Sequence, residues 1–182
     1  MNPSVILLTP DEIDVKAAEM DALFEVATPR HSQIEIPEMI RLSDEVSIMK
    51  GEVTVGLFKQ VMKGYEITGD KAEQLKGHLA KPAKAGAALV FVSLHDAREF
   101  AKRLSELTGR KFRVQTEDEW EQGKAQLSGD NWTWTSDEIE SSGKFVLRNI
   151  RSADPGGNYP EFRFPNSAIR LVEYLPKGQA GK

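Results

Sequence analysis

The sequence contains no cysteine among its 182 residues. Without a thiol, the chain can form no disulfide, bind no metal through a thiolate and use no cysteine as a nucleophile. Long hydrophobic runs are also missing, because the longest, residues 85–92, is far shorter than the roughly 20 residues of a membrane helix. The apolar residues 5–8 follow no basic stretch and precede acidic residues, which argues against a secretory signal. We therefore predict a cytoplasmic protein without a membrane span, and leave display on a virion or cell surface by another route open.

A concentration of positive charge is lacking as well. The formal net charge is −4, which argues against general binding to nucleic acid phosphates. The charge is uneven, since residues 144–182 contain seven Lys or Arg and three acidic residues, a local excess of +4. Residues 1–143 therefore carry −8. A hydrophobic content of 40% with 29% charged residues is otherwise typical of one globular domain.

The first part of the sequence mixes helical and strand patterns. A capping box and apolar residues at helical spacing predict a helix over about 10–26. Alternating apolar residues predict two short strands, one at 34–36 and one at 46–48. A second helix is expected over 54–64, between a capping Thr and a Gly. Residues 64–87, rich in Gly and Lys, predict a long surface loop.

The centre of the sequence contains the strongest helical signals. The apolar run 88–92 predicts a buried strand, and a Ser then opens a helix that runs to Gly109. A short strand follows at 112–114. A second capping box predicts a helix of about ten residues beginning at Thr116, with Trp120 on its buried face.

Strand patterns replace helical ones in the last part of the sequence. Alternation predicts strands around 132–134, 144–150 and 168–172. Residues 151–166, with three Pro and two Gly, predict a long irregular excursion between the last two strands.

We divide the chain accordingly into an N-terminal helical extension (1–28), one domain (29–176) and a loose tail (177–182).

Residues 113–121 carry a resemblance to a known family. They read Arg-Val-Gln-Thr-Glu-Asp-Glu-Trp-Glu and agree at six of nine positions with the Arg-Leu-Pro-Thr-Glu-Ala-Glu-Trp-Glu signature of the formylglycine-generating, or sulfatase-modifying factor, domain family. Further motifs are similar to those of the family in the same order, namely 52–54, 92–97, 132–137, 146–148 and 169–172. The resemblance covers about 45–175, so the helix predicted at 10–26 stands outside it.

The resemblance implies an α+β, C-type-lectin-like fold. In that fold two central helices accompany small, mostly antiparallel sheets with long loops. It also implies that Trp132 and Trp134 belong to the scaffold, although an exposed pair of this kind could instead stack on a sugar or base.

Departures from the family bear directly on function. Its formylglycine-generating enzymes rely on a cysteine pair near the C-terminus, and that activity is excluded here because the chain has no cysteine. A related branch uses a histidine-rich iron site, whereas His31, His78 and His95 are isolated from one another in the sequence. We therefore predict no catalytic residues and no metal ligands.

Calcium is the one cofactor left open. The family often carries calcium, and oxygen ligands are available close together in the sequence, at Asp130, Asp137, Glu138 and Glu140. No spaced calcium-loop pattern accompanies these residues.

A polar segment near the C-terminus provides the candidate binding site. Lectin-like folds use the corresponding region as a ligand-binding face, and its mixture of Tyr, Asn, Ser and Arg is typical of adaptable recognition surfaces. The predicted ligand-binding residues are Asn149, Arg151, Ser152, Asp154, Asn158, Tyr159, Glu161 and Arg163. A solvated loop without a partner is the alternative reading of the same residues.

We therefore interpret the sequence as a non-catalytic protein, a pseudoenzyme of its family, that binds a protein or other macromolecule through this loop. Residues 166–172 are similar to the closing stretch of the variable proteins of diversity-generating retroelements, which makes that group a hypothesis for this chain. The alternatives are a metal-dependent enzyme or regulatory subunit of the superfamily, and a structural assembly subunit. In the last case residues 10–26 would mediate formation of a homo-oligomer.

Overall fold

The computed structural model describes residues 34–82 and 86–175. The helix predicted at 10–26, the N-terminal extension and the tail at 177–182 lie outside these residues. The helices are α2 (Val55–Val61), α3 (Ala72–Ala80), α4 (Leu94–Thr108), α5 (Glu117–Gly123) and the 3-10 helix η1 (Lys124–Gln126). The strands are β1 (Met39–Arg41), β2 (Val46–Met49), β3 (Lys111–Val114), β4 (Trp132–Glu138), β5 (Phe145–Arg148), β6 (Gly156–Asn158), β7 (Ser167–Ala168) and β8 (Leu171–Tyr174).

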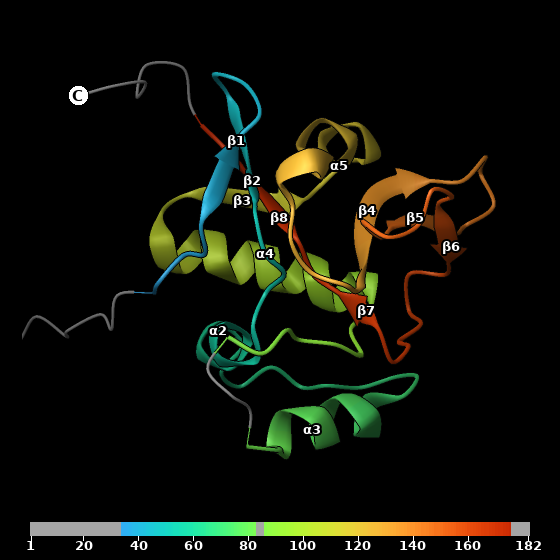
Figure 1. Cartoon of the computed structure of the whole chain (residues 1–182). Helices are drawn as coiled ribbons and strands as arrows, with labels where there is room; N and C mark the ends of the chain where they lie inside the picture. The colour runs from blue at the N-terminus through green and yellow to red at the C-terminus, as the bar shows by residue number, and fades with distance from the viewer. Residues whose placement is uncertain (1–33, 83–85, 176–182) are drawn as a thin grey trace, which may run out of the picture. The chain divides into compact units, whose positions relative to one another are not determined.

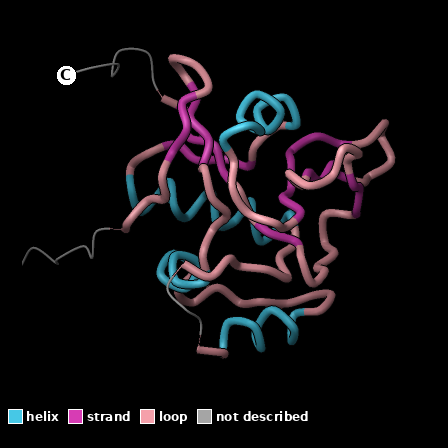
Figure 2. Tube along the Cα trace, viewed as in Figure 1, coloured by secondary structure: helices cyan, strands magenta, loops and turns pink. Residues whose placement is uncertain are grey.

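The strands form two small four-stranded sheets, drawn in Figure 1. The first has the order β1-β2-β8-β3 and is antiparallel throughout. The second has the order β6-β5-β4-β7, with β7 parallel to β4 and the other neighbours antiparallel. Figure 2 shows how much of the chain runs in loops between these elements. The α+β fold with small, mostly antiparallel sheets is thus confirmed.

Local capping signals in the sequence are confirmed by the helix ends. Thr54, Ser93 and Thr116 are the N-caps of α2, α4 and α5, and each hydroxyl accepts a hydrogen bond from a first-turn N–H. The last two form complete capping boxes. Gly109 ends α4 in the left-handed conformation at φ 70°, which a residue without a Cβ adopts at little cost.

Three predictions for the first half are corrected. The first strand lies at 39–41 and not at 34–36. The segment 64–87, predicted as a loop, contains helix α3, whose N-cap Lys71 makes no side-chain capping bond and therefore leaves no sequence signal. Residues 88–92 form no strand but an irregular, partly buried segment with one bridge, from Thr54 to Ala88.

Two further predictions for the second half are corrected. The final strand predicted at 168–172 is divided, because β7 joins the second sheet and β8 the first, with Ile169 and Arg170 between them. The excursion 151–166 contains the short strand β6. Helix α5 spans seven residues, and the 3-10 helix η1 continues it to Gln126, which together gives the ten helical residues expected.

The core lies where the helices cover the first sheet. Helix α4 packs against β3 and α2, and α5 packs against β2. Ile48, Trp120 and Val172 meet in one buried cluster between α5 and the sheet. Helix α4 is amphipathic and buries apolar residues such as Leu104, although Leu107 near its end is exposed. None of the helices in the described ranges is long and apolar enough to cross a membrane.

Candidate functional site

The C-terminal loop, which we define as residues 149–166, leaves β5, forms β6 and returns to β7. Its exposed large hydrophobic side chains are Tyr159 and Phe162, each 39% accessible. Their rings meet edge to face, with centroids 5.7 Å apart. The ammonium of Lys144 lies 5.3 Å from the centroid of the Tyr159 ring, within the range of a cation–π contact. We call Tyr159 and Phe162 the aromatic pair.

Arg163 belongs to this loop, but its side chain points into the protein and only 3% of the residue's surface is accessible. Its Nε and Nη2 donate to the two carboxylate oxygens of Asp96 at 2.7 and 2.8 Å. Its Nη1 donates to the backbone carbonyls of Thr68, at 2.8 Å, and Asp70, at 2.7 Å. The prediction of Arg163 as a ligand contact is therefore corrected, because its guanidinium is occupied inside the protein.

The carboxylate of Asp96 accepts the hydrogen bonds that hold the loop in place. Asp96 is fully buried at the N-terminus of α4, where Ser93 N–H and the Tyr65 hydroxyl also donate to its carboxylate. Burial alone would raise the pKa of Asp96, but the hydrogen bonds from Arg163 and Ser93 outweigh it and hold this pKa below its ordinary value. Burial and the neighbouring carboxylate raise the pKa of Tyr65 to about 12. These groups join α4, the segment before α3 and the loop.

The start of the loop is also held from within. Asn149 is buried, donates from Nδ2 to the carbonyl of Asp130 at 2.8 Å and accepts the N–H of Arg151 at 2.7 Å. Arg151 extends outward and pairs with the Asp130 carboxylate at 2.7 Å, with both side chains largely exposed. Asn149 therefore supports the loop, whereas Arg151 is available at its surface.

The remaining predicted residues lie at or near the surface. Ser152 donates to the carbonyl of Asp154 at 2.8 Å, which closes a local turn. Asn158 accepts the N–H of Tyr159 at 2.9 Å, and Glu161 is exposed. The predicted set thus divides into residues that hold the loop and residues that are displayed on it.

Sequence reasoning missed two contributors to this surface, Phe162 and Lys144. A further cation lies nearby, since the guanidinium carbon of Arg98 on α4 is 4.8 Å from the Phe145 ring centroid. Phe162 could have been found from its surroundings, because it is a second large aromatic residue in the same polar segment as Tyr159. The two cations come from other parts of the sequence and carried no comparable signal.

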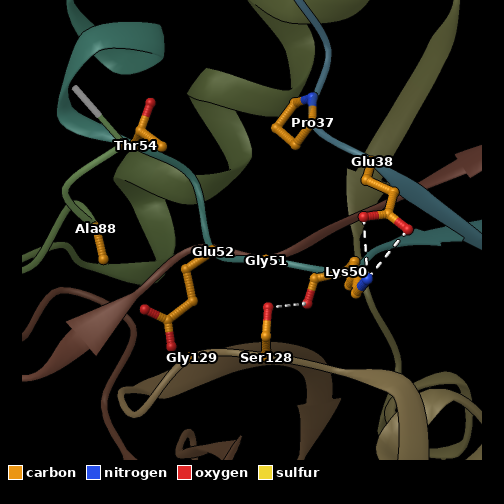
Figure 3. Close-up of a pocket in the computed structure, with 10 residues that line it drawn as sticks. Pro37, Glu38, Lys50, Gly51, Glu52, Thr54, Ala88, Ser128 and Gly129 are labelled. Carbon is orange, nitrogen blue, oxygen red and sulfur yellow. Dashed lines mark hydrogen bonds and ion pairs between the residues drawn. The ribbon is translucent and has the colours of Figure 1, made fainter.

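A hollow of about 410 Å³ lies away from the C-terminal loop. Figure 3 shows its lining around Glu52, Gly51 and Ser128. Lys50 at its edge pairs with Glu38 at 3.0 Å. Ser128 Oγ donates to the Lys50 carbonyl at 3.3 Å.

The carboxylate of Glu52 is committed to the scaffold at this hollow. It accepts the backbone N–H of Asn131 at 2.9 Å and its Nδ2 at 2.6 Å. Gly129, at φ 113°, lies directly beneath it, where an added Cβ would collide with the carboxylate. Burial lowers the pKa of the nearby Arg170 to about 10, although Glu52 partly compensates. These contacts favour a structural role for the hollow.

Metal ligands do not gather in the described part of the chain, where no three His, Cys, Asp or Glu side chains are grouped to hold an ion. Of the acids considered for calcium, Asp130 pairs with Arg151. Asp137 accepts the N–H of Glu117 at 2.7 Å. His31 lies outside the described residues.

The sequence matches the family model of the sulfatase-modifying factor enzyme 1-like domain over residues 3–154. No curated protein matches it. Similar solved structures include PvdO from Pseudomonas aeruginosa, with 15% identity, 71% of this chain and 80% of that chain covered, and a TM-score of 0.57. CarF has 15% identity, coverage of 78% and 94%, and a TM-score of 0.53. The variable protein 1 of Treponema denticola has 13% identity, coverage of 70% and 84%, and a TM-score of 0.48.

Proposed function

Because the chain belongs to the sulfatase-modifying factor enzyme 1-like domain family and yet contains no cysteine, we propose that it is a non-catalytic binding protein whose recognition surface is the C-terminal loop. The fold is C-type-lectin-like, as the sequence resemblance implied. The observation that carries the proposal is the aromatic pair, two large apolar side chains displayed on a loop that is fixed from below.

Fixing the loop is what makes this surface suitable for binding. The Asp96–Arg163 pair is buried, with 0% and 4% of the two side chains accessible, and it ties the loop to α4. A loop that is already ordered loses little conformational freedom when a ligand binds, so more of the contact energy appears as affinity. The residues that hold the loop in place, Asp96 and Arg163, are thus different from the residues exposed on it, Tyr159 and Phe162.

The displayed residues favour a protein ligand. Exposed aromatic side chains commonly provide central contacts of protein interfaces, where they combine a large apolar area with few rotatable bonds. Lys144 lies beside Tyr159 and Arg98 lies over the ring of Phe145, the residue after Lys144, and neither cation forms an ion pair with a carboxylate in the described ranges. We infer that the ligand has an apolar residue for the aromatic pair and negative charge for these cations.

Parallel affinity capture tests the proposal. The baits are the wild-type protein, the double variant Tyr159→Ala/Phe162→Ala and the control Tyr174→Ala, which removes a 43% exposed tyrosine elsewhere. A ligand should be retained by wild type and control and lost by the double variant. Titration with the purified ligand should show binding weakened by about 30-fold or more, as expected for truncation of a central aromatic contact.

Two outcomes would contradict the proposal. One is a ligand that the double variant binds as tightly as the wild type does. The other is stoichiometric iron or copper found by elemental analysis of the purified protein, which would favour the alternative of a metal-dependent enzyme.

We propose further that the chain is a variable protein of a diversity-generating retroelement, a hypothesis that rests on residues 166–172. The genome of the source organism can test it. A reverse transcriptase gene beside a near-copy of the 3′ coding region would support it. Sequence differences among copies should then fall on displayed positions such as Tyr159 and Glu161 and should spare the buried Asn149 and Arg163. Differences concentrated at the buried positions would contradict it.

A further inference from the structure

Strand β6 has an open edge beside the aromatic pair. It is the outermost strand of its sheet, since β5 pairs with one side of it and no other strand of the described chain joins the opposite side. In an antiparallel pair only alternate residues direct their N–H and C=O groups to the partner strand. The remaining backbone groups of Gly156–Asn158 therefore point away from the sheet.

The two faces of β6 are covered even though its edge is open. A Cβ added to Gly156 would lie 3.0 Å from the Trp132 ring, and one added to Gly157 would collide with Ile139. Successive strand residues face opposite sides, so Trp132 covers one face and Ile139 the other. What remains accessible is the backbone edge itself.

The short length of β6 is the one feature of this edge that disfavours the addition of another strand. Gly156–Asn158 contain no charged residue and no proline, the residue types that proteins use to prevent pairing at a free edge. Tyr159 follows directly, so the aromatic pair lies at one end of the edge. Lys144 lies beside the same end, because Phe145, the residue after it, pairs with Asn158.

We propose that the ligand of this protein presents an extended polypeptide segment, which adds to the β6 edge as a further strand of the second sheet. This inference rests on the proposed binding function and specifies its ligand. The segment would place an apolar side chain against the aromatic pair and a carboxylate beside Lys144. Backbone hydrogen bonds would supply affinity, and these two side chains would supply specificity.

A selection from displayed random linear peptides provides the probe. Peptides are selected on the wild-type protein, and those that also bind Tyr174→Ala but not Tyr159→Ala/Phe162→Ala are retained. The selected sequences should combine an apolar residue with Asp or Glu. A selection that yields no peptide dependent on the aromatic pair overturns the inference.

Backbone N-methylation of a selected peptide then tests strand addition. Each position is methylated in turn, which removes one N–H without changing any side chain. Alternate positions should lose about tenfold or more in affinity, because only every second N–H of an added strand faces β6. Loss without this alternation, or no loss at any position, overturns strand addition.

Amide hydrogen exchange gives an independent measurement on the protein. The peptide should slow exchange at outward-facing N–H groups within Gly156–Asn158. Exchange should stay unchanged in Met39–Arg41, which forms the edge of the first sheet within the described residues. Unchanged exchange at β6 with the peptide bound overturns the inference.

The alternative is that the wild-type protein pairs through β6 with a second copy of itself. Light scattering would then show a dimer, and peptide binding would fall as the dimer forms. That result would also overturn the inference.

The two proposals can fail separately. If the double aromatic variant loses the peptide and N-methylation shows no alternation, the C-terminal loop is a binding surface but its ligand does not add as a strand. If the double variant keeps every ligand, the binding function itself fails.

Discussion

The two sheets of this protein are surrounded by segments that are held in different ways. Around the first sheet, α5 is held by a buried apolar cluster that includes Ile48, Trp120 and Val172. Beside the second sheet, the C-terminal loop is held by the buried pair of Asp96 and Arg163. A loop fixed by hydrogen-bonded charges needs few apolar side chains for its own support. The comparison explains how this loop can leave Tyr159 and Phe162 at the surface.

Breaking the buried ion pair should have the largest effect. Arg163→Ala removes one partner and leaves the Asp96 carboxylate buried without its cation, which should lower the free energy of unfolding by about 3–5 kcal/mol. Urea denaturation measures this loss. Arg151→Ala is the matched control, because its pair with Asp130 is exposed and should contribute no more than about 1 kcal/mol. Equal losses in the two variants would show that the loop does not depend on buried charge.

Part of the same contribution should disappear on acidification. The folded-state pKa of Asp96 lies below its unfolded value, so its contribution is present above the unfolded pKa and is lost as the pH falls through the folded one. Urea denaturation from pH 7 downward should show this loss in the wild type. Asp96→Asn should show a shallower loss, with the remainder arising from other carboxylates such as Glu119, whose pKa is also lowered. An equally steep decline in the variant would contradict the assignment.

A smaller effect is expected from Gly129→Ala, next to the first sheet. The new Cβ would meet the Glu52 carboxylate at a backbone φ of 113°, and strain of this kind costs about 1–3 kcal/mol. Gly86→Ala is the control, because its φ is 84° but no atom of the described residues lies within 4 Å of the added Cβ. Thermal denaturation of both variants should show a greater loss for Gly129→Ala. Equal losses would assign the whole effect to backbone conformation and none to the contact with Glu52.

The smallest effect on stability is expected at the surface of the loop. Tyr159→Ala/Phe162→Ala should change the free energy of unfolding by less than about 1 kcal/mol, because both side chains are partly exposed in the folded state. Urea denaturation of the purified variant checks this. A loss as large as that of Arg163→Ala would mean that the aromatic pair supports the loop instead of being displayed by it.

Much of the fold could be predicted from the sequence because its signals are local. The capping residues Ser93 and Thr116 and the terminating Gly109 act within a few positions of the chain, and all three predictions are confirmed. Residues 88–92 could not be assigned correctly, since burial without strand pairing depends on distant elements. The α3 helix was missed because Lys71, its N-cap, makes no side-chain capping bond.

The candidate site was predictable only in part for a similar reason. Tyr159 was identified from its polar, irregular surroundings, and the structure places it at the surface. Arg163 was placed on the surface by the same reasoning, because charged residues in polar segments are normally solvated. Its carboxylate partner, Asp96, is 67 positions away and belongs to a helix start, so no local pattern could indicate the pair.

The short interval between β7 and β8 has a consequence for the order of folding. Only Ile169 and Arg170 separate the strand that completes one sheet from the strand that lies between β2 and β3 in the other. Until ribosomal synthesis has passed residue 168, β4 lacks one of its two partners, and until it has passed residue 174, β2 and β3 have no central neighbour. Both sheets should therefore form late and together, in a single transition that follows release of the β8 segment from the ribosomal tunnel.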